Sequence, residues 1–178
     1  MLIRERRPAD DPAIRQLLTA AFDDSRVADL ADALDARADR PTAPLVAEVG
    51  GEPVGYVQLS RSWVDAAPRV VDVLVLSPLG VLPARQRQGV GRALCHAAVQ
   101  RADELGDPAV FLEGDPAYYA KLGWERASDR GFTAPSTRIP DVAFQVVLLP
   151  SWQDWMTGPL VYNDTFWAMD FVGLRERN

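Results

Sequence analysis

Cysteine and histidine are almost absent from this chain, which holds one of each, Cys95 and His96. An internal disulfide needs two cysteines, and a zinc site usually draws its ligands from several His and Cys side chains. The sequence therefore predicts neither a disulfide framework nor a bound metal.

Long apolar runs and an excess of basic residues are also missing. The first residues, MLIRERRPADD, carry charges where a secretory signal would be apolar, and no later run approaches the roughly 18 apolar residues of a membrane span. The formal net charge is −6, whereas nucleic-acid-binding proteins usually carry a basic excess that neutralises phosphates. We therefore expect a cytoplasmic protein whose partners are neither membranes nor nucleic acids.

The chain has enough apolar residues for a core. Its 178 residues are 48% hydrophobic, and domains typically span roughly 100–200 residues. No composition shift or low-complexity segment marks a boundary. We predict a single domain over residues 1–178.

Hydrophobic periodicity predicts an alternation of helices and strands. Asp11 is the expected N-cap of a first helix with Pro12 at its first position, and a second helix should run from Ser25 to the region of Pro41–Pro44. The remaining predicted elements are a hairpin across Gly50 and Gly51, a long strand over 70–82, a helix from Val90 to Leu105, a strand over 109–115, a short helix from Pro116 and a strand over 143–150. Pro78 cannot donate a ladder hydrogen bond, so we expect a bulge in the long strand. This order predicts a mixed α/β fold.

The segment PARQRQGVGRAL, residues 83–94, joins the long strand to the next helix. A helix N-terminus presents unpaired N–H groups, and Gly89 and Gly91 let a ligand approach the backbone. Such turns bind phosphates, and Arg85, Arg87 and Arg92 add positive charge to an acidic protein. The segment therefore predicts a phosphate-bearing ligand. Two plainer interpretations remain open, namely a tight turn without a ligand and a solvated basic loop.

Two common nucleotide-binding motifs do not fit this segment. A Rossmann fingerprint needs a third glycine where the chain has Leu94, and a P-loop needs a Gly-Lys-Ser/Thr sequence that the chain lacks. The residues Gln86-Arg87-Gln88-Gly89-Val90-Gly91 instead resemble the Gln/Arg-x-x-Gly-x-Gly/Ala signature of the GNAT superfamily of N-acetyltransferases. The flanking LGVLPARQRQGVGRAL is similar to the central strand, pyrophosphate turn and helix of that family, and YYAKLGW is similar to its downstream Tyr-x-x-x-Gly-aromatic motif.

The resemblance covers the core, residues 1–149, and implies a mixed, mostly antiparallel central sheet flanked by helices. EGDPAYYAKLGW also resembles a bacterial subgroup of predicted acetyltransferases that carry Gly-Asp-Pro-x-Tyr-Tyr, and the aromatic-rich extension over 150–178 resembles the C-terminal part of that subgroup less closely. The resemblance implies acetyl-CoA as cosubstrate, with CoA as product. The cofactor-binding residues it implies are Leu79, Gly80 and Val81 for the pantetheine arm and Arg85, Gln86, Arg87, Gln88, Gly89, Val90, Gly91 and Arg92 for the pyrophosphate.

The same resemblance places the catalytic general acid at Tyr119, which would protonate the departing CoA thiolate. Ordinary packing of Tyr118 and Tyr119 is the alternative, and helix geometry lets at most one of the two face the thioester. A general base must accept a proton from the amine. Glu113 is our first candidate, ahead of Asp72, Asp115 and His96, although water could relay the proton instead.

Three further features admit plain structural interpretations. We expect Asp115 to cap the helix at Pro116, and Cys95 to be a small buried residue, because no histidine is arranged with it in a recognisable catalytic triad. The tail aromatics could roof an acceptor pocket, form a dimer contact or fill the core; they are Trp152, Trp155, Tyr162, Phe166 and Trp167. The aspartates of the first two helices could attract a cationic amine, but such charges usually form a solvated face.

We therefore expect an acetyl-CoA-dependent N-acetyltransferase, in which a small-molecule or peptide amine attacks the thioester directly in a ternary complex. The alternative is a non-catalytic CoA-binding or sensing module with the same fold, because none of the candidate bases is clearly marked by the sequence. A scaffold that binds a partner through its tail is a third hypothesis, and a homodimer is compatible with each.

Overall fold

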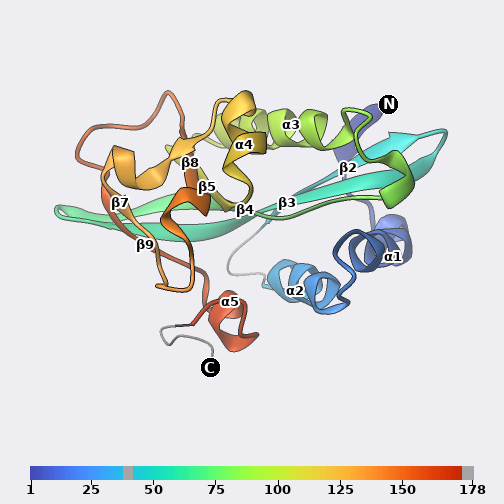
Figure 1. Cartoon of the computed structure of the whole chain (residues 1–178), viewed down its shortest axis with the longest axis horizontal. Helices are drawn as coiled ribbons and strands as arrows, with labels where there is room; N and C mark the ends of the chain where they lie inside the picture. Colours follow the sequence, from blue (N-terminus) through green and yellow to red (C-terminus); the bar gives the residue numbers. More distant parts are fainter. Residues whose placement is uncertain (38–41, 174–178) are drawn as a thin grey trace. The chain divides into compact units, whose positions relative to one another are not determined.

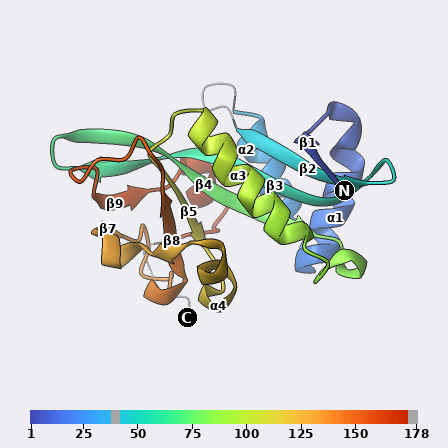
Figure 2. The same ribbon diagram turned by 90° about the horizontal axis from the view of Figure 1, so that it is seen from above.

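The computed structural model describes residues 1–37 and 42–173, and the chain divides into two compact units (Figure 1, Figure 2). The first unit consists of residues 1–60 and 76–101, and the second of residues 61–75 and those from 102 onward. Strands β3 (Glu52–Ala66) and β4 (Arg69–Val81) contribute residues to both units. Our expectation of a single domain stays a prediction.

The first unit is a helix-covered sheet in which β1, β2, β3 and β4 follow one another. Its antiparallel pairs include Ile3 of β1 opposite Ala47 of β2, and Val46 of β2 opposite Tyr56 of β3. Its other elements are β1 (Leu2–Glu5), η1 (Pro8–Asp10), α1 (Asp11–Phe22), α2 (Arg26–Asp35), β2 (Ala43–Val49), the 3-10 helix η2 (Pro83–Arg85) and α3 (Val90–Glu104).

Helices lie close against both faces of this sheet, with α3 on one side and α1 and α2 on the other (Figure 1). A Cβ added to Gly80 of β4 would lie 2.9 Å from the Leu18 side chain of α1. A Cβ added to Gly55 of β3 would lie 2.8 Å from Val90 and Leu94 of α3. Gly80 thus lets α1 approach β4, the strand that leads to the turn at residues 83–92, and Gly55 lets α3 approach β3.

The second unit is built around β5 (Ala109–Glu113). This strand pairs in parallel with β4, where Leu74 faces Val110, and antiparallel with β8 (Phe144–Leu148), where Glu113 faces Phe144. The remaining elements are α4 (Pro116–Tyr119), η3 (Ala120–Leu122), β6 (Glu125–Arg126), η4 (Ala127–Arg130), β7 (Phe132–Thr133), η5 (Asp141–Ala143), β9 (Gly158–Val161) and α5 (Asp164–Ala168).

Packed aromatic rings form the core of the second unit. The Phe111 ring meets the Phe132 ring edge-on at 4.8 Å and stacks on the Phe144 ring at 5.7 Å, and all three residues are buried. The C-terminal strand β9 pairs antiparallel with the end of β3 and in parallel with β7. The extension is therefore part of the sheet structure of this unit.

Most of the predicted helices and strands are confirmed. The glycine hairpin illustrates how a local sequence feature determines the backbone. Gly50 and Gly51 have φ angles of +62° and +87°, which glycine adopts without a Cβ penalty. Helix α1 begins one residue earlier than predicted, and its N-cap is Asp10 rather than Asp11. Helix α2 ends at Asp35, and residues 38–41, which include the expected stop at Pro41, lie outside the described part of the chain.

Strand β4 continues through Pro78, whose peptide bond with Ser77 is cis, and the bulge expected there stays a prediction. Sequence patterns did not reveal β6, β7, β9 or α5. These elements have two to five residues each, too few for a hydrophobic period to emerge.

Candidate active site

The turn between β4 and α3 exposes backbone N–H groups. The first hydrogen bond of α3 joins the Ala93 N–H to the Gly89 carbonyl at 3.0 Å, so the N–H groups of Val90, Gly91 and Arg92 precede the helical hydrogen bonds. Gly89 has a φ of +85°, and an added Cβ there would meet only Arg92 Nη2, at 3.9 Å. The positive end of the helix dipole is therefore open to an anion.

Polar side chains brace the same turn. Gln86 Nε2 donates to the Val81 carbonyl at 3.2 Å, and Gln88 Nε2 donates to the Ala84 carbonyl at 3.0 Å. Arg85, Arg87 and Arg92 in the same segment are exposed. Two of the predicted cofactor residues thus shape the turn, and three present positive charge at its surface.

The end of β4 supplies the remaining predicted cofactor residues. The ladder between β4 and β5 pairs Leu74 and Val75, so Leu79 to Val81 lie beyond it. Val81 is buried, and the backbone at Gly80 lies against α1. The structure places the predicted cofactor residues in one strand, turn and helix of the first unit, as the sequence indicated.

Tyr119 lies at the end of α4 in the second unit, with its ring against the backbone of Gly114. A Cβ added to Gly114 would lie 2.9 Å from Cδ2 of that ring. The Tyr119 ring also meets Tyr118 edge-on at 4.9 Å and Trp124 at 5.9 Å. Sequence reasoning missed the role of Gly114, because its small size has meaning only once the position of Tyr119 is known.

Asp115 has the structural role that we expected. Its Oδ1 accepts a hydrogen bond from the Ala117 N–H at 2.8 Å and so caps α4. Asp72 and His96, which the sequence also offers as bases, are exposed on β4 and α3 respectively. Cys95 is buried, which keeps its thiol from acting as a nucleophile toward a substrate in solvent.

Glu113, at the end of β5, combines exposure with a specific partner. Its Oε1 accepts a hydrogen bond from the buried Tyr162 hydroxyl at 2.6 Å. Burial by neighbouring residues removes water from the Glu113 carboxyl and raises its pKa, whereas the hydrogen bond from Tyr162 lowers that pKa. A partly buried carboxylate that is more basic than usual is suited to accept a proton.

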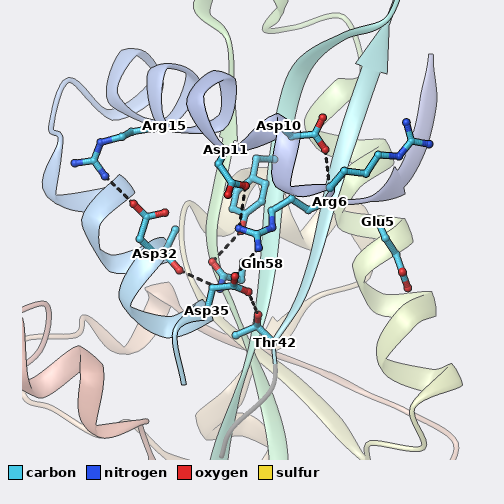
Figure 3. A network of polar contacts seen from close by, with 12 residues as sticks. Glu5, Arg6, Asp10, Asp11, Arg15, Asp32, Asp35, Thr42 and Gln58 are labelled. Carbon is cyan, nitrogen blue, oxygen red and sulfur yellow. Dashed lines mark hydrogen bonds and ion pairs between the residues drawn. The ribbon is translucent and has the colours of Figure 1, made fainter. Parts of the chain in front are cut away.

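The aspartates of α1 and α2 form ion pairs that limit their attraction for cations (Figure 3). Arg6 contacts Asp11 at 3.1 Å and Asp35 at 2.6 Å, and Thr42 donates to Asp35 at 2.8 Å. Arg15 likewise contacts Asp32 at 2.7 Å. These arginines neutralise the acidic face, so it offers little to an amine acceptor.

Neither a metal cluster nor a membrane-spanning helix occurs in the described residues. Within residues 1–37 and 42–173, no group of three or more His, Cys, Asp or Glu side chains could hold a metal ion. No helix in that same part of the chain has both the length and the apolar character needed to cross a membrane.

Comparison with known proteins identifies the class. The profile of the Acetyltransferase (GNAT) family matches residues 12–124. The uncharacterized N-acetyltransferase YhbS of Escherichia coli is 33% identical over 171 residues, which cover 93% of this chain and 98% of that protein. The uncharacterized N-acetyltransferase YjhQ of the same species is 33% identical over 71% of each chain.

Solved structures agree with these matches. The crystal structure of YhbS from Escherichia coli in complex with CoA has a TM-score of 0.84, at 30% identity, and covers 99% of this chain and 95% of that one. A GNAT family acetyltransferase from Brucella melitensis in complex with acetyl-CoA has a TM-score of 0.74, at 28% identity, and covers 93% and 97%.

The chain therefore belongs to the GNAT family of acetyltransferases and has the mixed, mostly antiparallel fold that its sequence predicted. It is an acetyl-CoA-dependent N-acetyltransferase.

Proposed function

We propose that the segment 79–92 binds acetyl-CoA and that the N–H groups at the start of α3 hold its pyrophosphate. The observation that carries this proposal is the open, left-handed backbone at Gly89, directly before a helix N-terminus and beside three exposed arginines. The CoA and acetyl-CoA bound in the two similar structures support it.

The pantetheine arm would lie along Leu79 to Val81, which the ladder with β5 does not include. Its two amides need strand-like hydrogen-bond partners, and the end of a strand can supply them. A backbone N–H near Leu79 would polarise the thioester carbonyl and stabilise the negative charge that develops on its oxygen.

The acid and base complete the transfer. The amine nitrogen attacks the thioester carbon, and Glu113 accepts a proton from that nitrogen. The carbon–sulfur bond then breaks, and the Tyr119 phenol donates its proton to the departing thiolate. The support for these roles is the raised pKa of the partly buried Glu113 carboxyl, and the fixed ring of Tyr119 against Gly114.

The acceptor is an amine carried by a small molecule or a peptide. The acetyltransferase itself is a cytoplasmic protein. We also assign the chain to the subgroup that carries Gly-Asp-Pro-x-Tyr-Tyr. Three of these residues act together here, because Gly114 accommodates the Tyr119 ring and Asp115 caps the helix that presents it. A homodimer is compatible with this assignment.

Calorimetric titration of acetyl-CoA tests the cofactor assignment. We expect saturable one-to-one binding with a Kd between about 1 µM and 1 mM, the usual range for enzyme substrates. Gly89→Val should weaken binding by about tenfold or more, because a β-branched residue strains the left-handed backbone. Gly106→Val is the matched control, with a φ of +78° and open space at the opposite end of α3.

Equal loss of binding in both variants, or retained affinity in Gly89→Val, would contradict the assignment of the turn. Binding without CoA release in the presence of mixed amines would favour a CoA-sensing module instead.

A further inference from the structure

The C-terminal extension supplies a contact that the proposed chemistry leaves unused. Tyr162 is buried, and its hydroxyl donates to Glu113 Oε1 at 2.6 Å, although the two residues are 49 positions apart in the chain. An O–H to carboxylate hydrogen bond of this length is charge-assisted and among the stronger ones in proteins. Such a bond fixes both the orientation and the proton affinity of the carboxyl.

The chain holds Tyr162 on both sides. Before it, β9 pairs with β3, with Val161 opposite Trp63. After it, the Asn163 N–H donates to Ser62 Oγ at 3.2 Å, and Asn163 Oδ1 accepts from the Thr165 N–H at 3.0 Å, which caps α5. A hydroxyl carried by a residue held in this way has little freedom to leave its partner.

The Tyr162 ring is also packed in place. Its centroid lies 4.9 Å from that of the buried Phe166 ring in α5. Phenylalanine at position 162 would keep this ring contact and lose only the hydroxyl, so one substitution can separate the hydrogen bond from the packing.

The carboxyl of Glu113 stays available on its second oxygen. The residue is exposed, and within the described part of the chain the hydrogen bond to Glu113 engages Oε1, which leaves Oε2 for an incoming proton. Four titratable side chains lie within six positions of Glu113 in the sequence. Asp107 pairs with Arg61, Asp115 caps α4, and the other two are Tyr118 and Tyr119. Across the ladder, β8 presents the neutral Gln145, which donates to the Gly114 carbonyl at 3.1 Å.

We propose that Tyr162 is a positioning residue for the general base. Through this tyrosine, the C-terminal extension holds Glu113 with one carboxylate oxygen directed toward the acceptor amine. This inference rests on the proposed role of Glu113. It assigns to the extension a part in the acetyl transfer itself, because the tail residue orients the group that accepts the amine proton.

The hydrogen bond stabilises the ionised carboxylate of Glu113, so its removal should change the pKa of Glu113 in a defined direction. Without the Tyr162 hydroxyl, no hydrogen bond from this residue counteracts the effect of burial, and the pKa of the Glu113 carboxyl rises further. The base would then be protonated over a wider pH range, and the acidic limb of the kcat profile would move to higher pH.

Tyr162→Phe tests this expectation. We expect the acidic limb to shift to higher pH and kcat near pH 7 to fall, with an unchanged Kd for acetyl-CoA. The fall should be smaller than the roughly hundredfold or greater loss expected for Glu113→Gln, which removes the base itself. Tyr56→Phe is the matched control, since it deletes another buried hydroxyl, one that donates to Gln58 at 3.1 Å. An unshifted limb in Tyr162→Phe, or an equal shift in Tyr56→Phe, would overturn the inference.

A titration without an acceptor distinguishes this inference from the proposed function. Carbon-detected NMR of the Glu113 carboxyl should give a higher pKa in Tyr162→Phe than in the unsubstituted chain, and an equal pKa would overturn the pairing. Full turnover of Glu113→Gln would instead remove Glu113 from the chemistry while leaving the pairing in place. If Tyr162→Phe does not fold, the Tyr162 Cζ resonance of the unsubstituted chain must titrate together with the Glu113 carboxyl; independent titration would overturn the inference.

Discussion

Two glycines act at the residue scale for different reasons. Gly89 is needed for its backbone, because its φ of +85° lies in the left-handed region that most residues avoid. Gly114 is needed for its missing side chain, because the Tyr119 ring occupies the space that a Cβ would fill. Substitution at either position would alter the site without removing any charged group.

Tyr119 is the residue whose chemistry is most directly testable. Tyr119→Phe keeps the ring that packs against Gly114 and removes the proton donor. We expect turnover to fall by about a hundredfold, typical of a lost general acid, with little change in the Kd for acetyl-CoA. Steady-state assays of CoA release with an amine acceptor, together with calorimetry, give the two quantities.

The neighbouring Tyr118→Phe is the control, because Tyr118 is exposed and should leave turnover near its original value. Unchanged turnover in Tyr119→Phe would remove this phenol from the mechanism.

At the scale of elements, one ionic cluster joins β1 and β2 to the start of α1. Arg4 of β1 binds both oxygens of Asp10, at 2.6 and 2.8 Å, and also contacts Glu48 of β2 at 2.7 Å. The Arg7 N–H donates to Asp10 Oδ2 at 2.7 Å. These contacts explain why Asp10 turns its carboxylate toward β1 and does not cap the helix with its side chain.

The stabilisation that this cluster contributes to the fold should depend on pH in a known direction. The hydrogen bonds from Arg4, and from the Arg7 N–H, lower the pKa of Asp10 from 3.8 to about 2. Because the folded-state pKa is depressed, the stabilisation is present above pH 3.8 and is lost as the pH falls toward 2. Asp10→Asn should therefore reduce the free energy of unfolding by about 2 kcal/mol at pH 7, and by less near pH 3.

Urea unfolding at the two pH values measures this difference. The control is Asp24→Asn, which removes a half-buried carboxylate paired with the exposed Arg26, a surface contact of little net value. A loss in Asp10→Asn that is the same at both pH values would show that the charge of Asp10 is not the cause.

At the scale of the whole molecule, similarity to relatives extends beyond the family profile. The profile ends at residue 124, whereas the match to YhbS covers 93% of this chain. The part beyond the profile contains β8, β9, α5 and Tyr162. The extension is therefore shared with a relative and is no isolated addition to this sequence.

Cofactor binding should stabilise the whole chain against heat. A ligand that binds only the folded state adds about 2.7 kcal/mol at a concentration of 100 Kd, which corresponds to a rise in Tm of roughly 5–10 °C for a chain of this length. Differential scanning fluorimetry with acetyl-CoA measures the rise. S-acetylpantetheine, which lacks the pyrophosphate, and the Gly89→Val variant should each give much smaller rises. Equal rises with both compounds would show that the pyrophosphate contributes little.

Several features of this protein could be predicted from the sequence because they are local. The hairpin at Gly50 and Gly51, the turn at residues 83–92 and the Asp115 cap each depend on residues a few positions apart. The order of helices and strands followed from hydrophobic periodicity for the same reason. The resemblance of the turn then indicated the family and its cosubstrate.

Only the tertiary structure decided which residues surround Glu113. The Tyr162 contact spans 49 positions and depends on the pairing of β9 with β3, which four residues of extended chain do not signal by themselves. The fit of Tyr119 against Gly114 likewise depends on the path of α4. Sequence patterns determine local backbone conformation, whereas sheet register and packing determine which distant side chains meet, and the neighbours of a catalytic residue are of the second kind.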